Sequence, residues 1–172
     1  MSPEPDRSLE LRPLVDDDVD LVRLWLTQEH IRPWYAKPEE WLREMRERQG
    51  EFAFIHHLIA CEGEEPIGFC QYYRCEASGE PEFRAYWSKN GYSIDYLLAA
   101  SYLGRGLGKA LVNALADVVF EKTSAWVIVV QPERDNVASR ATLIASGFEH
   151  DADHDLFVRW RTDEVTRPIP RL

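Results

Sequence analysis

The chain has 172 residues, of which 45% are hydrophobic and 29% are charged. This composition is typical of one globular domain with a sizeable core, spanning residues 1–172, and excludes a disordered chain. No apolar run is long enough to cross a bilayer, and the opening MSPEPDRSLE lacks the apolar stretch of a signal peptide, so we expect a cytoplasmic protein.

Thirty acidic and twenty basic residues give a formal net charge of −10. This charge argues against binding to nucleic acid or a membrane and is compatible with a small cationic ligand, although an acidic surface that only confers solubility would look the same. The three cysteines, Cys61, Cys70 and Cys75, indicate neither a disulfide framework nor a metal site, and no metal is expected.

The first half of the chain predicts two helices followed by a hairpin. Three aspartates at 16–18 supply an N-cap and first-turn acids for the first helix. The predicted elements are a strand at 9–14, a helix through Leu21 to Trp25, a helix at 38–49, and strands at 52–61 and 66–74 joined by a four-residue turn.

The second half alternates strands and helices around a glycine-rich loop. A polar excursion at 75–92 comes first, and its acids and aromatics either line a cationic pocket or lie in solvent. The elements that follow are a strand at 92–100, a loop at 103–108, a helix to about 120, a buried strand at 124–132, a helix at 135–146 ending at Gly147, closing strands at 148–149 and 155–161, and a loose tail at 165–172. This order predicts an α+β domain with a mixed sheet.

The loop Leu103-Gly104-Arg105-Gly106-Leu107-Gly108 is the most informative segment. Alternate glycines before an amphipathic helix let backbone N–H groups surround one anion, aided by the helix dipole. Arg105 and Lys109 add positive charge at the same place. The pattern therefore predicts a phosphate site, although a plain turn can also carry it.

The element order and this loop resemble the GCN5-related N-acetyltransferase (GNAT) superfamily. Its pyrophosphate loop has the pattern Q/R-x-x-G-x-G/A, matched here by Gly106 and Gly108, with Leu103 in place of the polar residue. A second match is Asn136 followed by Gly147-Phe148, which fits the family block N-x(10)-G-F. The resemblance implies a mostly antiparallel sheet that splays between its fourth and fifth strands, flanked by helices.

Finer motifs resemble the aminoglycoside 6′-N-acetyltransferase branch. These are Glu29-His30-Ile31 with Trp34, Glu65-Pro66-Ile67-Gly68 with Gln71 and Tyr73, and Ile94-Asp95 ahead of the loop. The enzymes that acylate lysine derivatives in siderophore synthesis form a neighbouring branch with similar blocks. The resemblance therefore predicts the reaction more firmly than the acceptor.

The resemblance implies acetyl-CoA as cofactor and assigns residues to hold it. Backbone N–H groups near Leu97 and Leu98 would stabilise the thioester oxygen, and Asn136 would bind the pantetheine arm or the pyrophosphate. The pyrophosphate would lie on the loop residues, which are Leu103, Gly104, Arg105, Gly106, Leu107, Gly108 and Lys109.

Asp95 is the candidate general base. An amine with a pKa of about 8–10 must lose a proton before it attacks a thioester, and a carboxylate can accept that proton. Asp95 lies in an otherwise apolar strand just before the loop, where an unpaired buried acid would be costly, although it could instead point outward from the strand.

Two positions depart from the family pattern. Leu143 stands seven residues after Asn136, where many relatives have a tyrosine that protonates the departing thiolate; water or another hydroxyl, such as that of Tyr102, would have to serve. Gln131 replaces the acid that meets a cationic sugar in the aminoglycoside branch, and Glu133 and Asp135 lie nearby.

The expected activity is direct transfer of acetyl from acetyl-CoA to a primary amine of a small cationic acceptor. The first candidate for this acceptor is an aminoglycoside, acetylated at its 6′-amine. The acceptor residues implied are Trp34, Tyr35, Gln71, Tyr73, Asp95 and Gln131, although the aromatics could also be core residues. The alternatives are acylation of a siderophore hydroxylysine or another cellular amine, and a CoA-binding protein without catalysis. Either a monomer or a homodimer is compatible with the sequence.

Overall fold

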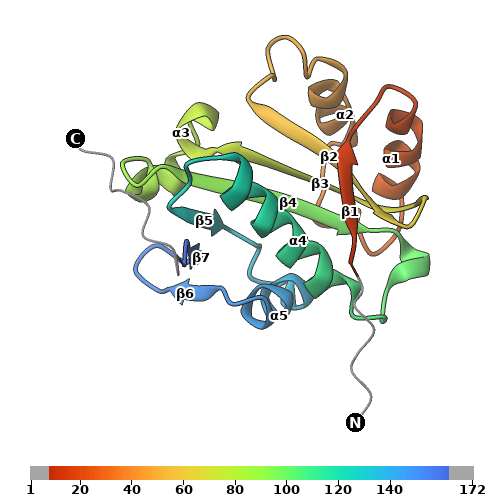
Figure 1. Cartoon of the computed structure of the whole chain (residues 1–172). Coiled ribbons are helices and arrows are strands. Elements are labelled where there is room, and N and C mark those ends of the chain that lie inside the picture. Colours follow the sequence, from red (N-terminus) through yellow and green to blue (C-terminus); the bar gives the residue numbers. More distant parts are fainter. Residues whose placement is uncertain (1–7, 163–172) are drawn as a thin grey trace.

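The structure is a computed structural model that describes residues 8–162, so the expected tail at 165–172 lies outside the described residues. Seven strands form one sheet in the order β1-β2-β3-β4-β5-β7-β6 (Figure 1). The strands are β1 (Glu10–Pro13), β2 (Ile55–Glu62), β3 (Glu65–Arg74), β4 (Gly91–Leu98), β5 (Val127–Val130), β6 (Glu149–Asp151) and β7 (Leu156–Trp160). The α+β class is confirmed.

The sheet is antiparallel except where β4 and β5 run parallel. These two strands pair only from Gly91↔Val127 to Ser93↔Val129, whereas β4 stays paired with β3 up to Leu98. Beyond Ser93 the two strands therefore diverge, and the predicted splay is confirmed.

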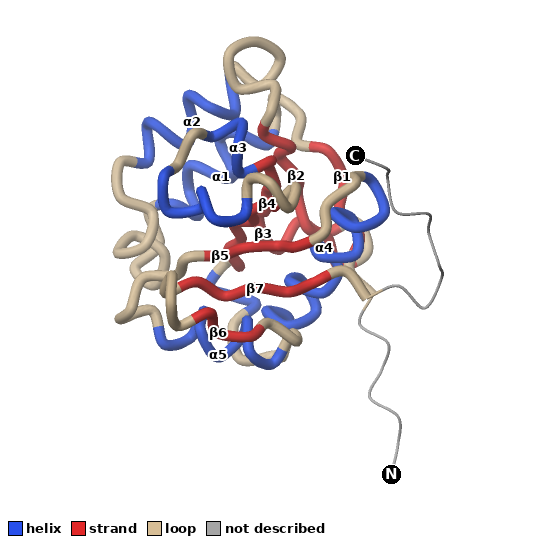
Figure 2. The backbone as a smooth tube through the Cα atoms, turned by 90° about the vertical axis from the view of Figure 1, so that its left-hand side faces the viewer, coloured by secondary structure: helices blue, strands red, loops and turns tan. Residues whose placement is uncertain are grey.

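Helices cover both faces of the sheet (Figures 1 and 2). Helices α1 (Asp18–Leu26) and α2 (Pro38–Arg46) share one apolar core with β2, β3 and β4, through residues such as Leu42, Ile59 and Phe69. The other face packs against α4 (Leu107–Lys122), and α5 (Val137–Ala145) packs against α4. Among residues 8–162, no helix is both long and apolar enough to cross a membrane.

The local signals that end and begin helices act as expected at α5. Asn136 caps its first turn by accepting a hydrogen bond from the Ser139 N–H at 3.2 Å. Gly147 follows the helix with a φ of 84°, a left-handed conformation that glycine adopts without strain.

Three segments differ from the sequence expectation. The hairpin between β2 and β3 turns at Gly63-Glu64 because the strands continue through Glu62 and Glu65, and β2 begins only at Ile55. The excursion contains two short helices, α3 (Cys75–Ser78) and η1 (Pro81–Tyr86).

The three cysteines are free and buried.

The aspartates before α1 also act differently from the prediction. Asp17 is at the N-cap, but its side chain makes no capping hydrogen bond. Asp18 accepts instead from the Val15 N–H at 2.8 Å and from the Arg12 guanidinium at 2.7 and 2.8 Å. These bonds hold the pKa of the Asp18 carboxyl below its usual value and tie α1 to β1.

Candidate active site

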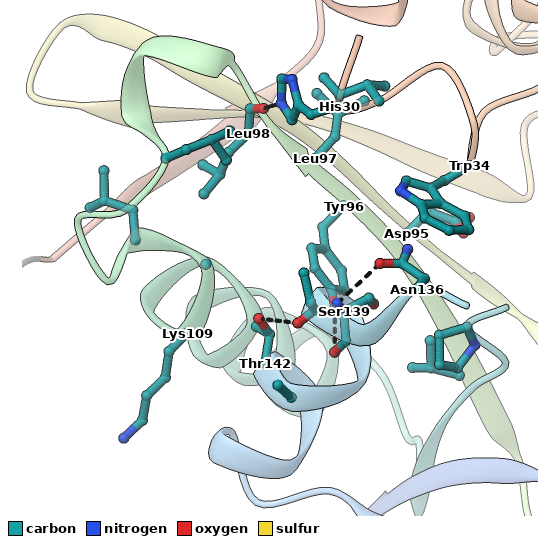
Figure 3. A pocket seen from close by; sticks show the side chains of 18 of the residues that line it. His30, Trp34, Asp95, Tyr96, Leu97, Leu98, Lys109, Asn136, Ser139 and Thr142 are labelled. Carbon is teal, nitrogen blue, oxygen red and sulfur yellow. Dashed lines mark hydrogen bonds between the residues drawn. The ribbon is translucent and has the colours of Figure 1, made fainter. Parts of the chain in front are cut away.

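A cavity of about 670 Å³ occupies the gap where β4 and β5 diverge. Its walls are the segment after α1, the end of β4, the glycine loop with the start of α4, the segment after β5, and α5. Figure 3 shows this space with Trp34 and Leu98 on one side and Ser139 and Thr142 of α5 on the other. The cavity thus brings together segments from most of the chain.

The glycine loop forms the end of the cavity at the start of α4. Gly104 and Gly106 adopt φ values of 74° and 72°, and Gly106 is the N-cap of α4. The backbone N–H groups that begin α4 have no partner within the helix, so this terminus attracts an anion. The structure therefore has the geometry of an anion site where the sequence predicted one.

All but one of the predicted cofactor residues line this cavity. They are Leu97, Leu98, Leu103, Gly104, Gly106, Leu107, Gly108, Lys109 and Asn136. Arg105 does not belong to the lining, and its guanidinium lies over the Tyr102 ring at 5.4 Å from the ring centre. Asn136 uses its Oδ1 for capping α5, which leaves Nδ2 as the atom that can donate into the cavity.

The backbone N–H groups of Leu97 and Leu98 in β4 point to opposite sides of the strand. The Leu97 carbonyl faces β3 so closely that a Cβ on Gly68 would lie 2.3 Å from it. The carbonyls of Tyr96 and Leu98 face the other way, where they accept from the Tyr35 hydroxyl at 2.7 Å and bond to His30 Nε2 at 2.8 Å. Because N–H and C=O of one strand residue point to the same side, the Leu98 N–H faces the gap and the Leu97 N–H faces β3.

Asp95 lines the cavity and does not point out into solvent. Its Oδ2 accepts a hydrogen bond from Gln71 Nε2 at 2.9 Å. Burial raises the pKa of Asp95 to about 6, Gln71 opposes this shift, and Glu80 adds to it. Asp95 is thus ionised at neutral pH and still basic enough to take a proton.

The predicted acceptor residues fall into two groups. Trp34, Tyr35 and Gln131 line the cavity. Gln71 and Tyr73 are buried behind it: Gln71 contacts Asp95, and the Tyr73 hydroxyl donates to Glu80 at 3.0 Å. Both therefore support the wall of the cavity from β3 instead of lining it.

Two carboxylates near Asp95 extend the set that sequence reasoning found. Glu80 is the acid of the excursion that turns toward Asp95, and Glu44 reaches the same place from α2. Burial, followed by the nearby charges of Asp95 and Glu80, raises the pKa of Glu44 to about 7. Sequence reasoning missed Glu44 because α2 carries many charges, and only its packing distinguishes this one.

Tyr96 also lines the cavity and was missed. Its hydroxyl lies 2.8 Å from the Ser139 Oγ, and burial raises its pKa to about 12 (Figure 3). Tyr102 lines the cavity too, but its hydroxyl donates to Glu65, which raises its pKa. Leu143, which stands seven residues after Asn136 and has no proton to give, is fully buried in the core.

Comparison with known proteins agrees with this geometry. Residues 15–157 match the family model described as the acetyltransferase (GNAT) domain. The chain therefore belongs to the GNAT acetyltransferase family and is a GNAT N-acetyltransferase-type enzyme.

Its relatives include aminoglycoside-modifying enzymes. The aminoglycoside N(6′)-acetyltransferase type 1 of Klebsiella pneumoniae is 30% identical over 153 residues, which cover 83% of this chain and 74% of the relative. The solved structure of AAC(6′)-Ib with paromomycin and acetyl-CoA superimposes with a TM-score of 0.74 at 28% identity, over 90% of this chain and 94% of that one. The complex of AAC(6′)-Ib with CoA and kanamycin matches with a TM-score of 0.74 at 29% identity, over 90% and 95%.

Proposed function

We propose that residues 1–172 form one acetyltransferase domain that moves acetyl from acetyl-CoA to a primary amine of a small polycationic acceptor, an aminoglycoside being the first candidate. One observation carries this proposal. A single cavity has an anion-binding loop at one end and Asp95, whose pKa is near 6, in its wall. Two relatives that the chain resembles over most of its length are 6′-N-acetyltransferases for aminoglycosides.

The residues of the cavity fit acetyl-CoA by their chemistry. The N–H groups at the start of α4, with Lys109 beside them, suit the pyrophosphate. Asn136 Nδ2 suits a carbonyl of the pantetheine arm, and the Leu98 N–H suits a thioester oxygen that gains negative charge. Acetyl-CoA would supply the acetyl group as a reactive thioester, and the residues of the cavity would orient it.

Asp95 is the proton acceptor in the proposed reaction. Asp95 takes one proton from the ammonium group, directly or through one water, and the neutral nitrogen forms a bond to the acetyl carbon. The carbon–sulfur bond then breaks, and the second proton of the nitrogen replaces the one that the sulfur receives. The Leu98 N–H stabilises the oxyanion between these events. The three thiols of the chain are buried, and burial raises the pKa of Cys70 and Cys75, so an acetyl-cysteine intermediate is not part of the proposal.

Tyr96 is the proposed proton donor to the departing sulfur. Its phenol enters the cavity from β4 and reaches α5, the helix on which Leu143 has no proton to give. Asp95 and Tyr96 are successive strand residues, so they project to opposite faces of β4. The amine can therefore be deprotonated on one face and the thiolate protonated on the other.

The acceptor side of the site is acidic. The charges of Asp95 and Glu80 contribute to the raised pKa of Glu44, Glu80 contributes to the raised pKa of Asp95, and Trp34 and Tyr35 provide aromatic walls nearby. Such a set suits an acceptor that carries several ammonium groups. Gln131 lines the cavity without charge, and Glu133 lines it as an acid.

The experiment is a screen for CoA thiol release with aminoglycosides, polyamines, lysine derivatives and peptide N-termini. We expect turnover with at least one aminoglycoside, and mass spectrometry should find one added acetyl group. Turnover restricted to hydroxylysine-type amines would overturn the aminoglycoside as acceptor in favour of a siderophore-type amine. Binding of acetyl-CoA without turnover of any amine would overturn the enzymatic proposal.

Replacing Asp95 tests the base directly. Asp95→Asn keeps the size of the side chain and removes the proton acceptor, so we expect kcat to fall about 10²- to 10⁴-fold. The dissociation constant of acetyl-CoA, measured by calorimetry, should stay within about twofold of wild type. Unchanged kcat would exclude Asp95 as the base.

A further inference from the structure

Three polar side chains form a row across the sheet, and one of them has no role in the proposed reaction. In the strand register, His57 of β2 pairs with Gln71 of β3, and Gln71 pairs with Asp95 of β4. Residues paired in this way point to the same face, with Cβ atoms about 4.5–5.5 Å apart. The row lies on the face covered by α1 and α2 and ends at the cavity.

One of the two neighbouring pairs in this row is hydrogen-bonded, and the other is not. Gln71 Nε2 donates to Asp95 Oδ2 at 2.9 Å. Among residues 8–162, Gln71 Oε1 and both ring nitrogens of His57 are buried without a hydrogen-bond partner. His57 is 5% exposed and Gln71 is 2% exposed, so bulk water does not satisfy them. Unpartnered buried polar atoms are rare because they cost free energy.

The unpartnered atoms are complementary. A neutral imidazole has one N–H donor, and the amide oxygen of glutamine is an acceptor. Burial is the main cause that lowers the pKa of His57 to about 4, and Arg48 and His56 add to this, so the ring is neutral near pH 7. A hydrogen bond from the His57 ring N–H to Gln71 Oε1 would therefore give a partner to one unpartnered atom of each side chain.

We propose that His57 is a positioning residue that donates its ring N–H to Gln71 Oε1 and thereby holds the Gln71 amide with its nitrogen toward Asp95. This inference rests on the proposed function, because Asp95 is the base there. The amide of glutamine has two nearly isosteric orientations, and only one of them presents N–H to a carboxylate. His57 selects that orientation from the far side of β3.

The role of the row is to set the proton affinity of Asp95. A donor to the ionised form stabilises the carboxylate and lowers its pKa, and Gln71 has this effect. Glu80 from the excursion, Glu44 from α2, and the phenols of Tyr35 and Tyr73 also lie near this carboxylate. The Tyr96 phenol lies close by on the opposite face of β4. Without the bond from Gln71, burial and the charge of Glu80 would push Asp95 toward its neutral form.

The test measures the pKa of Asp95 by following its carboxyl ¹³C resonance in the protein without substrate. In His57→Phe we expect this pKa to rise by about half a unit to one unit, the size of one lost hydrogen bond of ordinary net strength. In His57→Gln, which keeps an N–H donor, it should stay at the wild-type value. Because this readout needs no turnover, it remains decisive if the proposed function fails.

The matched control is His56→Phe, the same substitution one residue away. His56 is exposed and stacks on Tyr72 on the opposite face of the sheet, so its removal should leave the pKa of Asp95 unchanged. In Gln71→Leu the pKa should rise as in His57→Phe, and the double variant should rise no further, because the two residues act in series.

The same variants have a kinetic signature. In His57→Phe the acid limb of the kcat/KM profile should move to higher pH with the pKa of Asp95, and kcat/KM above pH 8 should stay within about twofold of wild type, since Asp95 is then ionised in both proteins. A loss of rate that is equal at every pH, or the same carboxyl pKa in wild type, His57→Phe and His57→Gln, would overturn the positioning role.

Discussion

At the scale of the residue, β4 places acid and base chemistry on neighbouring side chains. Asp95 belongs to the row of polar groups on the α1–α2 face, whereas Tyr96 reaches Ser139 of α5 on the other face. Both line the cavity because β5 has separated from β4 at this height. A paired strand would have covered this edge of β4.

Tyr96→Phe tests the proposed proton donor. We expect kcat to fall about tenfold, less than the roughly 10²- to 10⁴-fold typical of general acid catalysis, because a thiolate with a pKa of about 8.5 can still leave unassisted. The phenyl ring keeps the packing, so the thermal midpoint should change little. Steady-state thiol release measures the effect.

Tyr102→Phe is the matched control for this variant. Its hydroxyl lies in the same cavity wall but is bonded to Glu65, so kcat should stay within about twofold of wild type. Equal losses in both variants would mean that neither hydroxyl is the specific donor.

We expect Glu44 to make binding of the proposed acceptor depend on pH. Its pKa near 7 means that it gains charge between pH 6 and 8, so KM for a polycationic acceptor should fall over this range. Glu44→Gln should raise KM at pH 8 about fivefold, equivalent to roughly 1 kcal/mol for a partly exposed ion pair, and should flatten the pH dependence. Kinetics at several pH values measure both effects.

Glu39→Gln on the same helix is the control. Glu39 is exposed, pairs with Arg23 at 2.8 Å and does not contribute to the pKa of Glu44, so KM should not change. A fivefold rise in this variant as well would indicate a general effect of surface charge instead of a contact by Glu44.

Sequence patterns predicted residues whose chemistry is tied to a motif. The glycines, Asn136 and Asp95 are of this kind, and the structure places them around one cavity. Tyr96, Glu44 and His57 could not be found in this way, because their importance depends on strand register and helix packing. A tyrosine in an apolar strand or a glutamate in a charged helix carries no local signal.

At the scale of the element, the loop and α4 act as one unit, because the loop ends in the N-cap of the helix. Gly106→Ala places a Cβ at a φ of 72°, which costs about 1–2 kcal/mol for an L-residue. If the loop relaxes to relieve this strain, its N–H groups turn away from the anion, so we expect acetyl-CoA affinity to fall about fivefold to tenfold. Calorimetry measures the change.

Gly79→Ala is the control for this substitution. Gly79 has a φ of 70° after α3 and has open space where a Cβ would lie. It should lose similar stability in thermal unfolding and keep the affinity for acetyl-CoA. Loss of affinity in both variants would show that strain alone, and not the loop, is responsible.

Element boundaries were predictable where a local signal ends the element, and less so elsewhere. Gly147 and Asn136 fix α5 within two residues of the prediction. The β2–β3 turn was predicted too long because Glu62 and Glu65 read as loop residues, yet they pair with each other across the hairpin. Tertiary pairing here overrides the low strand propensity of glutamate.

At the scale of the whole molecule, the net charge of −10 produces a field that attracts cationic acceptors. Raising the salt concentration from about 50 to 300 mM shortens the screening length, so kcat/KM for a polycationic acceptor should fall severalfold. A monoamine acceptor should show a smaller loss. Initial rates at fixed acetyl-CoA measure this, and equal losses for both amines would contradict steering by charge.

The divergence of β4 and β5 also has a mechanical consequence. Within residues 8–162, only three residue pairs join the β1–β4 part of the sheet to the β5–β7–β6 part across that seam. A ligand wedged into the gap would bridge the two parts and oppose their hinging about this seam. Binding should therefore slow amide hydrogen exchange in β4 and β5 together, including at amides that the ligand does not touch. Without ligand, local opening of the sheet should be concentrated at the seam between these two strands.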